Sequence, residues 1–131
     1  MIDYEVAIFN AVYPDVAPLC ANNSFRSVHV PVPSAFPAAC LFEMRNTTDT
    51  RRRTGAAEED FAIITYEAHA YATDKQECKD VFNALDSTMA LIGFNRISGE
   101  MIPNQSNTKV FEYVGRYQAE IDQNGVIYRR R

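Results

Sequence analysis

A twelve-residue alternation of small and large side chains, Phe61 to Ala72, runs directly into an amphipathic helix near the middle of the chain. One side of this predicted strand is mostly alanine, and such a surface allows a helix to lie close to it. The helix is expected to follow at once, because Thr73 and Gln76 form a Thr-x-x-Gln capping box and Gly93 is suited to end it. Its apolar residues recur every three or four positions, at Cys78, Val81, Phe82, Leu85, Met89 and Ile92.

The chain before this unit predicts one helix and two strands. Apolar residues recur at helical spacing from Ile2 to about Tyr13, and Pro14 is expected to end that helix. Prolines then divide the chain into short extended pieces, with strands expected at Ser27–Val32 and Ala38–Met44. Because proline donates no hydrogen bond to a ladder, these strands are expected at sheet edges or to end at the prolines.

The last third of the chain predicts two strands and a hairpin. A strand at Arg96–Ile102 is expected to end at Pro103, and the segment Lys109–Asp122 alternates again. The Asn124-Gly125 pair is typical of a two-residue turn, so Val126–Tyr128 should fold back antiparallel onto that strand. One side of the strand is apolar, and the other is expected to face water, with Glu112, Arg116, Gln118, Glu120 and Asp122.

These elements together predict an α/β (α+β) fold, in which one antiparallel or mixed β-sheet is covered by two helices. The chain has 131 residues, near the commonest domain size, so we expect a single domain over residues 1–131. Hydrophobic residues make up 47% of it, with eight Phe and seven Tyr, which excludes a disordered chain.

The segment from Arg45 to Glu59 has no periodicity and no apolar side chain larger than alanine. We predict a long loop or a flexible hairpin arm at about residues 45–60, since a long structureless insert in a compact domain is usually functional or ordered by a partner. Opposite charges at its two ends suit pairing between copies in a ring. These charges are Arg51, Arg52 and Arg53 against Glu58, Glu59 and Asp60.

Charge and composition exclude several classes of protein. A net charge of −4 argues against an autonomous nucleic-acid-binding protein, which usually needs a basic surface. The start of the chain lacks the basic residues and apolar run of a signal peptide, and no stretch approaches the roughly 18 to 20 apolar residues of a membrane span. We therefore expect a protein of the cytosol, at least initially. Cys20, Cys40 and Cys78 are too far apart for a C-x-x-C metal site and are predicted to be buried thiols outside any disulfide.

Few residues point to chemistry. The sequence contains no G-x-S-x-G nucleophile motif, no phosphate-binding glycine loop and no H-E-x-x-H zinc motif. Both histidines, His29 and His69, are expected in strands, and His69 shares a strand face with Glu67 and Tyr71. His69 with Glu67 could form a catalytic base or half of a metal site. The alternative is that His69 is a partly buried histidine at a subunit contact, which is favoured because a metal site normally needs three or four ligands. The adjacent acids Glu58–Asp60 either hold a hard cation or form a solvated patch. We predict no enzyme and no catalytic, cofactor-binding or metal-binding residues.

Three segments share the pattern of one known family. The first is Phe36–Glu43, in which a Phe-Pro pair enters a strand that ends in an acid. The second is Phe61–Tyr71, running into the Lys75–Gly93 helix, and the third is Arg116–Asp122 with Ile127–Arg130 behind its turn. In these segments, and in the order of its elements, the chain resembles the tail terminator, or tail completion, proteins of long-tailed bacteriophages.

The resemblance implies a structural protein of the virion, at the junction between head and tail. Such subunits form a ring, usually of six copies, that caps the tail tube, ends its polymerisation and provides the docking surface for the head connector. The implied partners are copies of the chain, the tail tube protein and the head–tail stopper or connector, with DNA only passing through the channel and no membrane. Assembly is expected in the host cytoplasm. The expected interface residues are Arg51, Arg52, Arg53, Glu58, Glu59, Asp60, Glu112, Arg116, Gln118 and Glu120.

Three alternatives stay open. The nearest is a head-completion or stopper subunit of the same junction, which would bind the portal side instead of the tail tube. A small nucleic-acid-binding module would use exposed aromatic side chains such as Phe61 and Tyr71 on a sheet. A small hydrolase built around His69 and Glu67 would need a third catalytic partner.

Overall fold

The protein is described by a computed structural model covering residues 1–29, 33, 35–48, 61–103 and 109–128. Two α-helices, two short 3-10 helices and six strands make up this part of the chain. In chain order they are α1 (Glu5–Val16), η1 (Ala17–Leu19), η2 (Ala21–Asn23), β1 (Phe25–Arg26), β2 (Ala38–Thr48), β3 (Phe61–Ala72), α2 (Lys75–Ile92), β4 (Asn95–Pro103), β5 (Phe111–Asp122) and β6 (Ile127–Tyr128). A mixed sheet with two helices confirms the predicted fold class.

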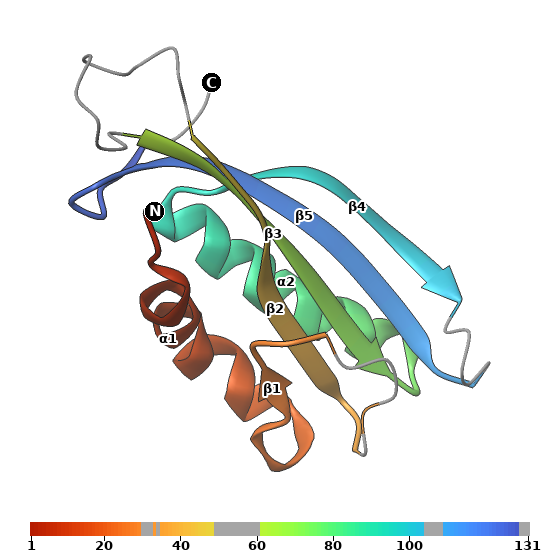
Figure 1. Cartoon of the computed structure of the whole chain (residues 1–131). Helices are drawn as coiled ribbons and strands as arrows, with labels where there is room; N and C mark the ends of the chain where they lie inside the picture. The colour runs from red at the N-terminus through yellow and green to blue at the C-terminus, as the bar shows by residue number, and fades with distance from the viewer. Residues whose placement is uncertain (30–32, 34, 49–60, 104–108, 129–131) are drawn as a thin grey trace.

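The sheet has the strand order β1-β2-β3-β5-β4, and β6 pairs with β5 beyond the start of β4 (Figure 1). β1 is parallel to β2, whereas all other pairs are antiparallel. β3 and β5 form the centre and pair along their whole length, from Phe61 opposite Asp122 to Ala72 opposite Phe111. Side chains of α1 and α2 join one cluster with the same face of the sheet, so both helices cover that face.

The strands agree with the sequence except near β1 and at the end of β2. The predicted loop or arm at about 45–60 is wrong for residues 45–48, which extend β2 beyond Met44 because they pair with Ala62–Thr65 of β3, and residues 49–60 lie outside the described part of the chain. β3 has the predicted bounds, β4 extends one residue beyond them at each end, and β6 forms the predicted hairpin with β5. The predicted strand at Ser27–Val32 is wrong for residues 27–29, which lie outside any strand, and residues 30–32 lie outside the described part of the chain. The strand instead forms earlier, at Phe25–Arg26, because Phe25 is buried against Phe9 and the Ser24 carbonyl accepts a bond from Ala39 N–H.

Helix α1 lies three residues later in the chain than predicted, and Pro14 does not end it. A proline removes one N–H donor, but Ala17 N–H still bonds to the Tyr13 carbonyl and closes the last turn. The helix turns Ile8, Val12 and Val16 into the core.

Helix α2 is capped by Asp74, not by the predicted Thr73. The Asp74 carboxylate accepts a hydrogen bond of 3.0 Å from Glu77 N–H, which satisfies one of the first amides of the helix. At the other end, the prediction for Gly93 is confirmed. This glycine has φ of 112°, a left-handed conformation that favours glycine, and its N–H bonds to Ala90.

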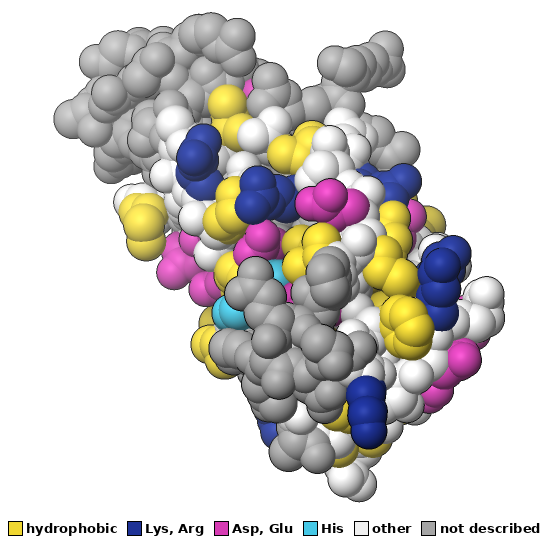
Figure 2. Space-filling view, turned by 90° about the vertical axis from the view of Figure 1, so that its right-hand side faces the viewer, with side chains coloured by type: hydrophobic (Ala, Val, Ile, Leu, Met, Phe, Trp, Pro, Cys, Tyr) yellow, Lys and Arg dark blue, Asp and Glu magenta, His cyan; other side chains and the backbone are white. Residues whose placement is uncertain are grey.

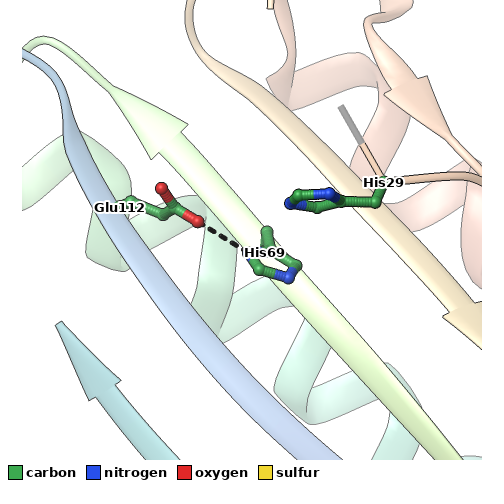
Figure 3. A group of neighbouring side chains, drawn as sticks. All are labelled: His29, His69 and Glu112. Atoms are coloured by element: carbon green, nitrogen blue, oxygen red, sulfur yellow. Dashed lines mark hydrogen bonds and ion pairs between the residues drawn. The ribbon is translucent and has the colours of Figure 1, made fainter. Parts of the chain in front are cut away.

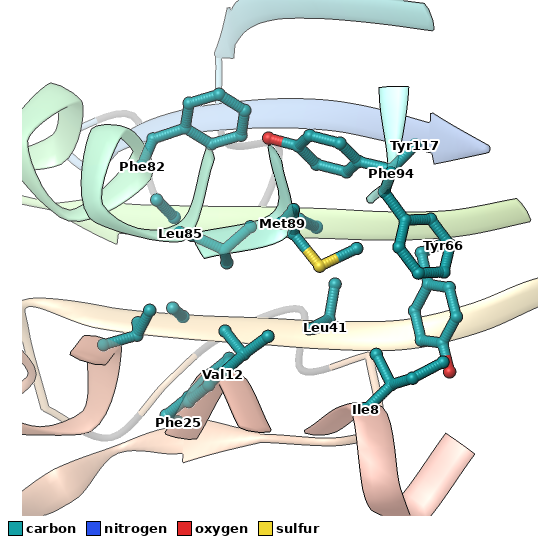
Figure 4. Packing of buried hydrophobic residues seen from close by; sticks show 14 of the residues in the cluster. Ile8, Val12, Phe25, Leu41, Tyr66, Phe82, Leu85, Met89, Phe94 and Tyr117 are labelled. Atoms are coloured by element: carbon teal, nitrogen blue, oxygen red, sulfur yellow. The ribbon is translucent and has the colours of Figure 1, made fainter. Parts of the chain in front are cut away.

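The core lies between the two helices and the sheet (Figure 4). Ile8 and Val12 of α1 and Leu85 and Met89 of α2 belong to one buried cluster with residues on the helix-covered face of the sheet. The largest buried side chains of the sheet in this layer are Leu41, Ile64, Tyr66, Tyr117 and Ile121. Full burial of one large apolar side chain contributes about 1.5–3 kcal/mol, so each of these residues stabilises the fold appreciably.

Very small residues lie beneath α2. Gly115 of β5 pairs with Ala68 on one side and Gly99 on the other, and the ring of Phe82 fills the space where a Cβ atom of Gly115 would be. The predicted alanine-rich surface of β3 therefore extends across three strands, and it lets the helix lie close to the sheet.

The two margins of the sheet differ. At the β2 margin, β1 pairs with Ala39 and Cys40, and Glu43 N–H donates a 2.8 Å hydrogen bond to the Glu5 carboxylate of α1. At the β4 margin, no strand of the described chain pairs with the outer edge. A bulge in β4 leaves Ile97 there with 54% of its surface exposed.

The hairpin between β5 and β6 is organised by Asp122. Its carboxylate accepts hydrogen bonds from Val126 N–H at 2.9 Å, Asn124 N–H at 2.8 Å and the Tyr128 hydroxyl at 3.1 Å. These bonds, the one from Val126 foremost, stabilise the ionised carboxylate and hold the pKa of Asp122 below its usual range.

Candidate functional site

The face of the sheet opposite the helices carries a cluster of two histidines and two glutamates. β3 supplies Glu67 and His69 from one side of its alternation, as the sequence predicted. β5 supplies Glu112, which lies opposite Tyr71 in the register between the two central strands. His29 comes from the connection between β1 and β2 and is not in a strand, so its predicted strand position is wrong.

His69 lies between two carboxylates. Its Nδ1 is 2.7 Å from Oε2 of Glu112, a hydrogen-bonding distance, and its Nε2 is 3.4 Å from Oε2 of Glu67. The His69 and Glu112 side chains are 8% and 9% exposed, so both groups are largely withdrawn from water. The Nε2 atom is buried and has no hydrogen-bond partner among the described residues. A buried polar atom in this state calls for an explanation, such as strain, a catalytic role, or a bound water or ion.

His29 completes a group of three ligand-type side chains (Figure 3). Its ring lies 4.8 Å from that of His69, centroid to centroid. One ligand atom each from His29, His69 and Glu112 lies within 4.8 Å of the other two. In Figure 3, Glu112 and His29 approach His69 from opposite sides. The three residues come from parts of the fold that are distant in sequence.

Arg116 fixes the second carboxylate. Its Nε and Nη2 atoms both lie 3.3 Å from Oε1 of Glu67, directly across from it in the β3–β5 register. The other oxygen of Glu67 is the one that faces His69. Arg116 therefore holds Glu67 in position beside the imidazole.

Aromatic rings surround the imidazole of His69. The rings of Phe42 and Tyr71 lie 5.9 Å from it, centroid to centroid, at interplanar angles of 13° and 8°. Tyr71 is fully buried, so the expectation that it is an exposed platform for nucleic-acid bases is wrong. Its strand neighbours and a second apolar cluster cover it, because this end of the face is packed against Val110 and Phe36. Burial, above all, raises the pKa of Tyr71 far above its usual range.

The polar face of β5 is less exposed to solvent than the sequence predicted. Glu112, Glu120 and Asp122 are buried, although Arg116 is exposed and Gln118 half-buried. The reason is topological, since β5 is a central strand whose neighbours on both sides shield its side chains. Figure 2 shows acidic, basic and apolar side chains interspersed over the side of the molecule where the histidines are visible.

The structure brings together only part of the set predicted from sequence. Glu112, Arg116, Gln118 and Glu120 share one face of β5, as expected. The other predicted interface residues, Arg51, Arg52, Arg53, Glu58, Glu59 and Asp60, lie outside the described part of the chain.

This arrangement has the chemistry of a metal-ligand set. In the described part of the chain, no hydroxyl or thiol is hydrogen-bonded to His69, so no nucleophile–base pair forms around it. Two imidazoles and a carboxylate are, by contrast, the ligand types that divalent transition metals take from proteins.

No local sequence pattern indicates that His29 and Glu112 meet His69. His29 is forty positions away from His69 in an irregular connection, and no periodic pattern places such a residue. The alternation along β5 places Glu112 on the expected face of its strand, but its distance from His69 depends on the register between β3 and β5. Only that register brings the two residues together.

Comparisons with known proteins found no matching family model and no matching curated protein. In the described residues, no helix is long and apolar enough to cross a membrane.

Proposed function

We propose that this chain is a ring-forming structural subunit of a long-tailed bacteriophage that caps the tail tube at the head–tail junction. The ring, of six copies by the resemblance, ends polymerisation of the tube and provides the surface on which the head connector docks. The proposal starts from the resemblance of Phe36–Glu43, Phe61–Tyr71 and Arg116–Asp122 to tail terminator proteins. Such a subunit acts through its shape and its contacts with other proteins, and it needs no turnover of a substrate.

The observation that carries the proposal is the difference between the two margins of the sheet. The β2 margin is occupied by β1 and by the Glu5–Glu43 bond, while the β4 margin has no strand partner among the described residues. Soluble monomers usually cover or shorten such an edge, because it can pair with another chain. A ring needs heterologous contacts, in which one surface of a copy meets a different surface of the next. Unequal margins suit that kind of contact.

Apolar exposure on the same margin supports this assignment. Ile97, at the bulge of β4, exposes 54% of its surface although it is a large aliphatic residue. Arg96 directly before it and Glu100 three residues after it are exposed charges of opposite sign, and Arg96 also lies 3.5 Å from Asp86 of α2. An apolar residue between charged residues of both signs is typical of an interface with an apolar centre and a polar rim.

The test is reconstitution with the tail tube protein of the same phage, followed by electron microscopy. With the protein present, we expect short tubes that end in a ring-shaped cap. Tubes of unregulated length with bare ends would contradict the proposal. Binding to the portal side in place of the tube would instead identify a head-completion subunit, and tight binding of single-stranded DNA by the monomer would identify a nucleic-acid-binding module.

A pair of variants tests the role of the β4 margin. Ile97→Lys places a charge on the exposed edge, and we expect the fraction of capped tubes to fall to that seen without the protein. The control is Leu91→Lys, the same change at an aliphatic residue of α2 that is 83% exposed, and it should cap normally. Equal capping by both variants would show that the contact lies elsewhere.

A further inference from the structure

We propose that His29, His69 and Glu112 bind a divalent transition-metal ion, and that Zn²⁺ is the ion this donor set suits best. From the sequence we predicted no metal-binding residues, because only one imidazole and one carboxylate were placed together. The fold supplies the missing third donor from the connection between β1 and β2. The inference does not rest on the role of the protein in a phage tail.

The three donors are already near the spacing that an ion requires. In a tetrahedral site with Zn–N and Zn–O bonds of about 2.0–2.2 Å, ligand atoms lie roughly 3.4 Å apart. Here one ligand atom of each residue lies within 4.8 Å of the others, and Nδ1 of His69 is 2.7 Å from Glu112. Binding would therefore draw His29 inward by about 1 Å and separate His69 from Glu112 by somewhat less.

The surroundings of His69 fit a bound metal better than they fit an isolated histidine. With Nδ1 on the ion, the proton of His69 resides on Nε2, the buried atom that otherwise has no hydrogen-bond partner among the described residues. Glu67 lies 3.4 Å from Nε2, and Arg116 holds its other oxygen. A metal-bound histidine usually donates its second N–H to such a carboxylate, which fixes the tautomer and the ring orientation.

The ligand chemistry selects the class of ion. Two imidazole nitrogens with one carboxylate suit Zn²⁺ and its neighbours in the transition series, whereas Mg²⁺ and Ca²⁺ prefer sites built from oxygen. The carboxylate of Glu112 also offers negative charge to a cation, whereas that of Glu67 is paired with Arg116. Three protein ligands leave one tetrahedral position for water or for a donor from another molecule.

Metal binding would have a structural effect in this protein. His69 and Glu112 are fixed in the two central strands, while His29 is exposed and lies in the connection that leads from β1 to β2. An ion shared by all three would tie that connection to the open face of the sheet. The expected consequence is a folded protein that is more stable with Zn²⁺ than without it.

The experiment is calorimetric titration of Zn²⁺ into the full chain, prepared without a histidine tag, with Mg²⁺ as the comparison ion. We expect one Zn²⁺ per chain, a higher melting temperature with Zn²⁺, and neither effect with Mg²⁺. Co²⁺ used as a probe should give the visible spectrum of nitrogen and oxygen ligands. Absence of Zn²⁺ binding, or a thiolate charge-transfer band from the cysteines with Co²⁺, would overturn the proposal.

Variants locate the site. His29→Ala removes an exposed ligand and should leave the fold intact, but we expect it to weaken Zn²⁺ binding by roughly tenfold or more, since even loss of a supporting residue has an effect of about 10–100-fold. Glu112→Gln should weaken it similarly. Glu100→Gln is the matched control, because Glu100 is an exposed carboxylate of β4 on the same sheet, and it should bind as the unmodified protein does. Unchanged affinity in His29→Ala and Glu112→Gln would refute the assignment.

Discussion

Glu43 is a carboxyl group whose ionised form is disfavoured in the folded protein. Burial raises its pKa first, and the negative charges of Glu5 and Asp3 at the start of α1 raise it further, although a hydrogen bond with Asn46 acts in the opposite direction. The backbone of Glu43 is meanwhile tied to Glu5 at the sheet margin. The contact that closes this margin therefore brings carboxylates close together.

We predict that Glu43→Gln stabilises the protein at neutral pH. Because the folded pKa is raised above the unfolded value of about 4.3, the folded state retains the Glu43 proton more strongly, and stability falls as pH rises through that window. Gln has no proton to lose, so the variant should be more stable at pH 7 and equal to the unmodified protein below pH of about 4. Urea unfolding between pH 4 and pH 8 measures this, with Glu100→Gln as the control. The same pH dependence in both variants would contradict it.

At this scale the sequence could predict which side chains share a strand face but not which ones meet. His69 and Glu67 were placed together because they are two positions apart in one strand. Glu112 and His29 join them only through the register of β3 with β5 and through an irregular connection. Residue pairs of this kind depend on the tertiary fold, so no local pattern contains them.

Helix α2 shows how far local signals reach at the scale of an element. Its apolar stripe and its glycine stop were both predicted, because they follow from helical periodicity and from the left-handed conformation of Gly93. Its cap was predicted one residue too early, since Thr73 with Gln76 and Asp74 with Glu77 have the same spacing. Which of Thr73 and Asp74 caps the helix depends on the direction in which the chain leaves β3, and the pairing of β3 in the sheet determines that direction.

We predict that Asp74→Ala destabilises the protein by about 1 kcal/mol, the typical effect of losing an N-cap. Thr73→Ala should change the free energy of unfolding by less than about half of that, because no capping bond comes from Thr73. Chemical denaturation of the two variants side by side gives the comparison. A larger loss in Thr73→Ala would restore the cap predicted from sequence.

The close approach of α2 to the sheet gives a second prediction. A methyl group in Gly115→Ala would meet the ring of Phe82, so we expect a loss of about 1–3 kcal/mol from overpacking. Phe82→Leu shortens the facing side chain, and the double variant should lose less than the sum of the two single variants. Strict additivity in this double-mutant cycle would mean that the two residues do not press on each other.

Across the whole molecule, two apolar clusters lie on opposite faces of one sheet. Cys78 belongs to the cluster under the helices and Cys40 to the cluster on the open face, and both thiols are fully buried. Burial raises the pKa of Cys78, as it does that of Cys20, to about 11, so little of either thiol is in its reactive form at neutral pH. Cys40 and Cys78 should each react only when the cluster that contains it opens.

We predict that all three cysteines react slowly in the native protein and that their rates converge as denaturant is added. A single sheet shared by both clusters should make them unfold as one cooperative unit. Alkylation followed by mass spectrometry of each cysteine measures the rates. Fast modification of Cys40 while Cys78 stays protected would show that the open-face cluster opens by itself.

The sequence predicted the elements of this domain better than their arrangement. The hairpin at Asn124-Gly125 is local and was predicted correctly, whereas β5 lies between β3 and β4 and so separates elements joined in sequence by α2. That order depends on pairing between distant segments, which local alternation does not encode. The unequal margins follow from it, because β1 and the Glu5 carboxylate of α1 occupy the β2 margin.

Because the two margins differ, only one side of the sheet is open to a further strand among the described residues. A strand from another molecule can extend the ladder at β4, but the opposite side is blocked by the molecule's own first turn of helix. A fibril of extended sheets would require the β4 edge of one molecule to pair with the β2 margin of the next, and among the described residues that margin is already occupied. Growth of a continuous sheet from molecule to molecule is therefore disfavoured.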